Sequence, residues 1–379
     1  LEIDELKLNS GFFNLSNKGK ISAQYKNSIY YIKDTELLMD YDGGICKLGF
    51  NNNGNNILIK GCIPVSLLRV FKEQITGARG KIDIDLSYGN KLNGTSNFRD
   101  VSITTYGHKL GTINAVGKML IDNNVLKLGS FSLNAGGASA SFNGTINMDK
   151  MFSLSGLYPT LNVGVKIDKL FLDYPDGFRG RWEGNIDVKG EKPPYSITGL
   201  MNVYDGTYRK DIEIARLALS KGKKIDDTVL FKRNKPNLQF DIKLKTANDI
   251  YVKNTTMTGE VAFDLGLKGT DVDPKLVGSV DLLNGNFIYF DNTFELLSGR
   301  VKFRDDDVEP IVYQLDSEAK INNYQVFLKM VSEKGEPKFS VSSTPPLTEE
   351  KILTLLATGD VQSDFMDQGG LTAGTGGNI

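Results

Sequence analysis

Few side chains in this sequence could serve as a nucleophile, a general base or a metal ligand. The chain has one histidine, His108 in YGHKLG, and two cysteines, Cys46 and Cys62. A Ser-His-Asp or Cys-His site would have to use His108, but YGHKLG has the composition of a hairpin turn and no companion motif accompanies it. We interpret His108 as an exposed turn residue and expect no catalytic residues.

The cysteines and the acidic residues do not form a metal-binding pattern. Two cysteines are too few for a disulfide scaffold, and their spacing is not that of a zinc site. Both lie in neighbouring strand-like segments, so two separate thiols and one disulfide are both open possibilities. The acidic run at 304–310 places Asp305, Asp306 and Asp307 side by side, whereas a calcium loop spreads its ligands over alternating positions. We expect a solvated loop there and no metal.

Signals for cofactors and nucleic acids are also missing from the sequence. It contains no HExxH, no CxxC and no GxxxxGK[ST], and the glycine-rich NAGGASA at 134–140 lacks the lysine and the following helix of a phosphate site. Lys and Arg total 45 against 46 for Asp and Glu, a net charge of -1 that provides no field for a polyanion. We predict a protein that is not an enzyme, with no cofactor and no nucleic-acid partner.

The dominant pattern is an alternation of apolar and polar residues. In LQFDIKLK at 238–245 every second residue is apolar, and successive side chains of a strand point to opposite faces of a sheet. Similar runs, LEIDELKL at 1–8 among them, are closed by Gly, Asn or Asp and predict about 20 strands joined by tight turns. Their apolar positions line either an open groove or an ordinary protein core. The candidates for a groove lining are Ile82, Ile84, Leu86, Leu238, Phe240, Ile242, Leu244, Val261, Phe263, Leu265 and Leu267.

Two segments have a helical pattern instead. PVSLLRVFKEQITG predicts a helix that begins at Pro64 and stops at Gly77. Its apolar face would consist of Leu67, Leu68, Phe71 and Ile75. TEEKILTLLATG predicts a second helix with Thr348 as its N-cap and Gly359 as its C-cap. The apolar side of this second helix either caps the end of the groove or touches a membrane, and we favour capping.

An internal repeat is visible when glycines and prolines are aligned. One copy contains Gly184, Gly190, Pro194, Gly199 and Gly206, and the other contains Gly259, Gly269, Pro274, Gly278 and Gly285. Each copy reads as strand, turn and strand. Such a unit cannot bury its apolar face alone, so repetition predicts an architecture in which units stack along one direction.

The C-terminal part carries the most specific motifs. GSVDLLNGNFIYFDNTFELLSGRVKF at 278–303 is followed by PKFSVSS and then by STPPLTEEKILTLLATG at 343–359. These stretches resemble the C-terminal domain of the TamB family, the inner-membrane-anchored half of the translocation and assembly module. The residues that match the final motif are Pro345, Pro346, Leu347, Glu349, Glu350, Ile352, Leu355, Leu356 and Gly359.

The resemblance implies an all-β fold: an elongated, curled, antiparallel or mixed β-sheet that forms an open hydrophobic groove, the β-taco, with a few short helices. It implies a repetitive groove over residues 1–346, matched best at 259–346, then a short C-terminal helix at 347–359 and a flexible Gly-rich tail at 360–379. Family members usually continue past the helix with strands that engage a barrel, whereas this sequence has Gly-rich residues there.

The function implied by the resemblance is lipid transfer without catalysis. The protein would form a bridge in the periplasm of a diderm bacterium and shield phospholipid acyl chains between the inner and outer membranes. Its implied partners are phospholipid, an outer-membrane barrel of the TamA or BamA type, and the inner membrane through an anchor outside this sequence. The alternative is a scaffold for assembly and secretion of outer-membrane proteins and autotransporters. Alternation alone would also suit a closed β-sandwich or a solenoid adhesin.

Overall fold

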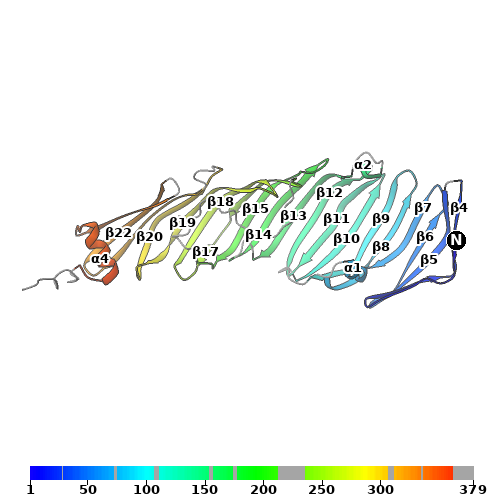
Figure 1. The fold of residues 1–379 in the computed structure, drawn as a ribbon, viewed down its shortest axis with the longest axis horizontal. Coiled ribbons are helices and arrows are strands. Elements are labelled where there is room, and N and C mark those ends of the chain that lie inside the picture. Colours follow the sequence, from blue (N-terminus) through cyan, green and yellow to red (C-terminus); the bar gives the residue numbers. More distant parts are fainter. Residues whose placement is uncertain are drawn as a thin grey trace, which may run out of the picture. The chain divides into compact units, whose positions relative to one another are not determined.

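The computed structural model describes residues 1–27, 29–71, 75–105, 111–152, 157–173, 177–211, 235–305, 311–333 and 336–361. In these residues the chain forms 23 strands and three short α-helices (Figure 1). The prediction of an all-β groove fold with few short helices is therefore confirmed. His108, Asp306, Asp307 and the predicted tail from residue 362 onward lie outside the described residues.

The chain divides into two compact units. The first comprises Leu1–Gly206, Val229–Asn248 and Gly266–Lys275, and the second comprises Thr207–Thr228, Asp249–Leu265 and Leu276–Ile379.

Except near the N-terminus, strands of the first unit are neighbours in chain order. They are β1 (Glu2–Ile3), β2 (Lys7–Ser10), β3 (Phe13–Lys18), β4 (Ile21–Lys26), β5 (Ile29–Tyr41), β6 (Gly44–Asn52), β7 (Ile57–Pro64), β8 (Ile75–Tyr88), β9 (Leu92–Thr105), β10 (Thr112–Asp122), β11 (Val125–Ala135), β12 (Ala138–Asn147), β13 (Thr160–Leu172), β14 (Phe178–Gly190), β15 (Tyr195–Tyr208) and β16 (Leu238–Thr246). The ladders between neighbours from β5 to β14 are antiparallel, whereas β15 and β16 run parallel. At about 4.8 Å per strand, β5 to β16 extend the first unit by about 50 Å across the strands.

LEIDELKL forms two short strands rather than one. β1 pairs with β4, and β2 pairs with β3, so the two halves of the run have different partners. The side chain of Asn17 holds the connection, because its Oδ1 accepts a hydrogen bond of 2.7 Å from the backbone N–H of Leu6. The alternation predicted the strand character of this run correctly and its continuity wrongly.

The helix predicted from Pro64 to Gly77 is much shorter than expected. A 3-10 turn, η1 (Val65–Leu67), leads into a single helical turn, α1 (Leu68–Phe71), and β8 already begins at Ile75. The predicted end is wrong because Ile75 and Gly77 take part in the antiparallel ladder with Thr105 and Thr104 of β9. Ladder partners in the neighbouring strand outweigh the local helical pattern here.

The apolar contact of this short turn comes from its first residue. Val65 is 2% exposed and packs in a cluster with Val101 and Ala115, on the face formed by β8 to β11. Leu68, which the helical pattern placed on the buried side, is 40% exposed. A second short helix, α2 (Asp149–Phe152), lies at the opposite ends of the strands from α1 (Figure 1).

A disulfide joins Cys46 in β6 to Cys62 in β7. Both cysteines are buried, and they pack in one cluster with Met39 of β5. Of the two possibilities that the sequence left open, the structure shows the bonded pair. The bond spans a sequence separation of 16 residues and fastens two strands that are already neighbours in the sheet.

The second unit is a smaller antiparallel sheet with a helix. Its elements are β17 (Ile250–Lys253), most of β18 (Met257–Thr270) and of β19 (Pro274–Tyr289), β20 (Asn292–Phe303), β21 (Ile311–Ile321), β22 (Tyr324–Glu333), β23 (Glu336–Thr344) and α4 (Glu349–Thr358). Both predicted cap residues take their positions: Thr348 is the N-cap residue, without a side-chain capping bond, and Gly359 closes the helix at φ 76° with its N–H bonded to the Leu355 carbonyl at 2.8 Å.

The aligned glycines of the repeat occupy equivalent places. A Cβ atom on Gly199 would lie 2.1 Å from the carbonyl oxygen of Asn185, and one on Gly278 would lie 2.2 Å from that of Asp264. Gly278 also has φ +115°, which L side chains rarely adopt. In both copies, therefore, the glycine lets the strand approach the backbone of the strand before it.

We expect Gly278→Ala to destabilise the second unit by about 1–3 kcal/mol, because a Cβ there meets backbone and the positive φ becomes strained. Denaturant unfolding followed by circular dichroism measures this loss. Gly129→Ala is the matched control, since Gly129 lies within β11 and a Cβ added to it would have no other atom within 4 Å. An equal loss in both variants would contradict the close-approach explanation.

Replacing both cysteines, as Cys46→Ala with Cys62→Ala, should lower the local stability of β6 and β7 by about 3 kcal/mol, the loop-closure value for a loop of this length. Hydrogen exchange of the β6 and β7 amides reports this change. Chemical reduction of the unaltered protein should give the same increase in exchange. Unchanged exchange after either treatment would show that the bond adds nothing to these strands.

Candidate functional site: the apolar face of the sheet

Apolar side chains of successive strands line up across one face of the first unit. One such row contains Ile82, Phe98, Gly117, Phe131, Phe142, Val165 and Ile186, one residue from each strand between β8 and β14. The ring centroids of Phe98 and Phe131 lie 5.0 Å apart, and those of Phe131 and Phe142 lie 5.6 Å apart. Gly117 has no side chain, so the first two rings meet over it.

This row continues to β16. A Cβ on Gly199 of β15 would lie 3.0 Å from the Ile186 Cα, and Gly199 is the ladder partner of Ile242 in the parallel pair. Ile82 and Ile242 were each selected from a separate alternating run. The structure places them in the same row, at opposite ends of a path from β8 to β16.

A second row runs parallel to the first and contains Leu86. Its members are Thr35, Phe50, Ile59, Leu86, Gly94, Ile121, Leu126, Ile146 and Leu161, from β5 to β13. Ile84 lies between the two rows, next to Ser96 and Met119. The face is therefore apolar over many strands, although single Ser and Thr residues interrupt it.

The predicted lining residues of the first unit are half-buried rather than fully buried. This holds for Ile82, Ile84, Leu86, Leu238, Phe240, Ile242, Leu244 and Leu267. In β16 the intervening Gln239, Asp241 and Lys243 are exposed. The two faces of this strand thus differ in both polarity and access to solvent.

The remaining predicted residues lie in β18 within the second unit. Val261 is 6% exposed and pairs with Ile250 of β17, whereas Phe263 and Leu265 are half-buried on the same side of β18. Leu265 lies beside Gly278 of β19, since a Cβ on that glycine would be 2.9 Å from the Leu265 Cα. β18 thus presents one apolar face, as the alternation predicted.

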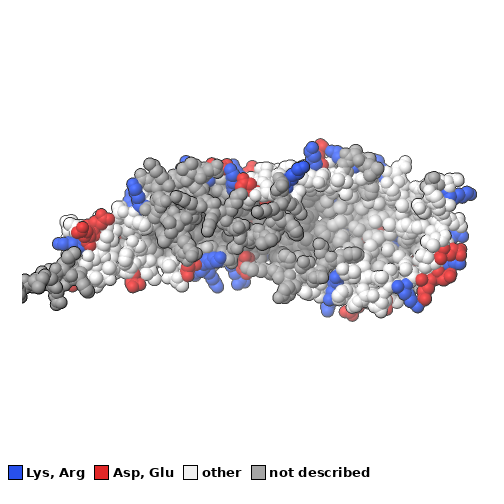
Figure 2. All heavy atoms as spheres, in the orientation of Figure 1, with Lys and Arg blue, Asp and Glu red and all other residues white. Residues whose placement is uncertain are grey.

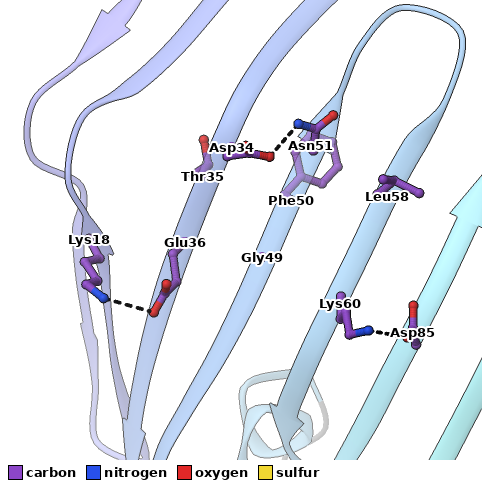
Figure 3. Close-up of a pocket in the computed structure, with 10 residues that line it drawn as sticks. All are labelled: Lys18, Asp34, Thr35, Glu36, Gly49, Phe50, Asn51, Leu58, Lys60 and Asp85. Carbon is purple, nitrogen blue, oxygen red and sulfur yellow. Dashed lines mark hydrogen bonds and ion pairs between the residues drawn. The ribbon is translucent and has the colours of Figure 1, made fainter.

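The opposite face of the first unit carries charges. Lys18, Glu36, Gly49, Lys60 and Asp85 form a row across β3, β5, β6, β7 and β8. The Lys60 Nζ lies 2.8 Å from the Asp85 carboxylate and the Lys18 Nζ lies 3.8 Å from Glu36 (Figure 3). The hydrogen bond from Lys60 to Asp85 raises the pKa of Lys60, so the lysine keeps its charge.

These charged side chains surround a shallow polar depression, which Figure 3 shows together with Asp34 and Asn51. The amide of Asn51 donates to Asp34 at 2.5 Å, so the polar groups here satisfy one another across strands. The depression has no histidine or cysteine at its lining and no group of metal ligands among the described residues. Its chemistry is that of a solvated outer face.

The distribution of charge on the molecular surface follows the same division. On the face shown in Figure 2, the described part of the first unit is largely uncharged, and the Lys, Arg, Asp and Glu side chains gather along the strand ends. Charged rims and an uncharged middle are the arrangement expected of a sheet with one face withdrawn from water.

In the second unit, α4 covers the apolar face of the sheet. Ile352, Leu355 and Leu356 are 0%, 0% and 2% exposed. They form one cluster with a set of buried strand residues that we call the α4 bed: Phe287, Phe294, Leu296, Tyr313, Leu315, Ala319, Ile321, Val326, Leu328 and Met330. Burying each of the three helix side chains contributes about 1.5–3 kcal/mol. The apolar side of α4 is therefore buried against the sheet, as expected of a helix that caps the groove, and is not exposed for contact with a membrane.

Two asparagines in hairpin turns fasten the C-terminal end of α4. The Nδ2 of Asn292 donates to the Leu356 carbonyl at 2.8 Å, and the Nδ2 of Asn322 donates to the Gly359 carbonyl at 2.6 Å. The last carbonyls of a helix have no partner within it, so these bonds satisfy groups that otherwise need water. Nothing in the alternation pattern distinguishes these asparagines from ordinary turn residues.

The other motif residues separate into two groups. Leu347 is half-buried and packs against the α4 bed. Pro345, Pro346, Glu349 and Glu350 are exposed. Next to the bed, Tyr289 stacks on Phe339 with centroids 6.2 Å apart, and burial raises the pKa of the Tyr289 phenol, which stays neutral.

Several residues of the apolar face were not selected from the sequence. The row of Phe98, Phe131, Phe142, Val165 and Ile186 is the clearest example. Their strands alternate less strictly than 238–245 because bulges shift the register of the ladders around them. The available signal was the single phenylalanine among alternating residues in each of ASASFNGTINM and GSFSLNA, Phe142 and Phe131.

A match to a known family decides what kind of protein carries this face. The TamB C-terminal domain matches residues 64–224 and 210–378, which together cover most of the chain. The chain belongs to the TamB family. A search among curated proteins finds no match. TamB proteins are components of the cell envelope and are associated with the translocation and assembly module, which is an assembly or transport machinery rather than an enzyme.

The family assignment agrees with the two-faced sheet of this TamB chain. None of its described helices has the length and apolar character needed to cross a membrane.

Proposed function

We propose that this TamB chain is part of a non-enzymatic lipid conduit: its apolar sheet face shields phospholipid acyl chains during passage across the periplasm between the inner and outer membranes. The observation that carries the proposal is the row from Ile82 to Ile242, in which half-buried apolar side chains follow one another without interruption by a charge. A row of this kind offers an acyl chain contact along its whole length.

The free energy at stake explains why such a face is useful. Exposing an acyl chain to water costs about 0.8 kcal/mol per methylene, so a sixteen-carbon chain carries a penalty on the order of 10 kcal/mol. A continuous apolar face removes this penalty at every point of the path. Lipid transfer then requires only that the acyl chain slide from one strand to the next, without covalent chemistry.

Oxidation of the cysteines supports the proposed compartment. Structural disulfides persist in oxidising environments such as the bacterial periplasm and are rare in the cytosol. The bond between Cys46 and Cys62 is buried in the sheet and closes a short loop, as a structural disulfide does.

A second candidate function is a scaffold for assembly and secretion of outer-membrane proteins with a barrel of the TamA or BamA type. It is favoured by the position of β23, the last strand of the second unit within the described residues, which forms a ladder with β22 on one side. Strand edges can pair with a partner strand by β-augmentation. Under this function the edge of β23 and α4 would matter more than the apolar face.

A photo-crosslinking amino acid placed at Phe240 should capture phospholipid in cells, because this side chain lies on the half-buried apolar face of β16. Phe263 in β18, which is also half-buried on an apolar face, is the position to use in the second unit. The matched control is Gln239, the adjacent residue on the exposed face of the same strand. Mass spectrometry of the adducts identifies the captured molecule. Adducts with protein strands alone, or equal capture at Gln239, would contradict the conduit.

Leu265→Arg should lower lipid transfer at least about tenfold, because a guanidinium on the apolar face has no partner and must keep its water. Transfer of labelled phospholipid between vesicles measures the effect. Gln239→Arg adds the same charge to the polar face and should leave transfer unchanged. A fully active Leu265→Arg protein that still binds a barrel would favour the scaffold function instead.

A further inference from the structure

Resting on the lipid conduit proposed above, we propose that the α4 bed is a second acyl-chain site and that α4 is a displaceable plug that occupies it. While α4 is docked, the apolar face of the second unit ends at the helix. When α4 leaves, an acyl chain takes its place on β20 to β22.

The bed lies on the same face as the proposed lining of β18. Leu265 is next to Gly278, whose ladder partner is Phe303, and Phe303 pairs with Ile311 at the margin of the bed. Along the neighbouring row, Val280 pairs with Val301, which pairs with Tyr313 of the bed. An acyl chain at Leu265 therefore meets no polar barrier before it reaches α4.

The bed itself has the chemistry of an acyl-chain site. Leu315 pairs with Met330, and Ala319 pairs with Val326, so aliphatic side chains alternate on one face of β21 and β22. Phe294 is fully buried and stacks on Phe287 with centroids 5.5 Å apart. Two residues of this face carry a hydroxyl, Tyr313 and Ser317, and Ser317, which is 1% exposed, donates its hydroxyl to the Leu328 carbonyl.

The contacts that hold α4 on the bed are few enough for an acyl chain to replace them. Three apolar side chains of the helix and two asparagine bonds to its terminal carbonyls hold α4, and Leu347 just before the helix also packs against the bed. A sixteen-carbon acyl chain has at least as much apolar surface to bury as these three side chains. Water can satisfy the two freed carbonyls, since both lie at the helix end, so replacing α4 by an acyl chain leaves no buried polar group unpaired.

The opposite side of α4 is suited to solvent. Leu353 is 42% exposed, and Glu349 and Glu350 are exposed in the first turn. This contrast between Ile352 and Leu353, adjacent in sequence and on different sides of the helix, provides a matched pair of variants.

The test places p-azidophenylalanine at Phe294, beneath α4, or at Phe263 on the open part of the face. The full chain is incubated with vesicles of palmitoyl-oleoyl phosphatidylethanolamine, irradiated, and analysed for lipid adducts by mass spectrometry. With native α4 we expect adducts at Phe263 and few at Phe294. Ile352→Glu, which drives α4 off the bed, should raise the adduct yield at Phe294 at least tenfold, and Leu353→Glu should leave it unchanged.

A second variant that loosens α4 without adding a charge tests the same proposal if Ile352→Glu unfolds the second unit. Asn292→Ala with Asn322→Ala removes both carbonyl bonds without adding charge and should raise the yield at Phe294 severalfold, with circular dichroism confirming the fold.

Each result bears on a different claim. Adducts at Phe263 with none at Phe294 in every folded variant would overturn the plug while leaving the conduit intact. Strong adducts at Phe294 with native α4 would show that the helix excludes nothing. No adducts at either position would overturn the conduit and the plug together.

Discussion

The constraint on which this molecule depends is the register of its strand ladders. Side chains of a strand alternate between faces, so a slip of one residue would exchange an entire apolar set for a polar one. From β8 to β14 the ladders keep Ile82, Phe98, Phe131 and Ile186 on one side through every pairing, although the register shifts in every ladder except that of β12 with β13. Each shift is followed by restored alternation, which keeps the two faces distinct.

The polar face follows from the same register. Lys60 and Asp85 are ladder partners, as are Lys18 and Glu36, so opposite charges meet directly across neighbouring strands. Exposed pairs of this kind contribute only about 0–1 kcal/mol each, and their larger effect is on specificity, since a strand slipped by one residue would place these charges on the apolar face. The apolar face and the charged face therefore both favour the same strand register.

Much of the fold was predictable because alternation is local information. The strand character of 81–89 or 238–245 can be read from the run itself, and the caps of α4 can be read from Thr348 and Gly359. The choice of partner is not local. The parallel pairing of β15 with β16, the division of residues 1–8 between two ladders, and the early start of β8 at Ile75 depend on strands elsewhere in the chain. The docking of Asn292 and Asn322 on the end of α4 likewise joins residues that only the fold brings together.

The repeated hairpin that places Gly199 against Asn185 and Gly278 against Asp264 makes the reach of this architecture adjustable. A hairpin contains two strands, so duplicating one within the chain adds about 10 Å of sheet and restores the original chain direction at its end. Because the added pair presents its oily side toward the same surface, the elements before and after it need no redesign. The sheet of a protein built this way can therefore be lengthened by whole hairpins, with the same contacts at each addition.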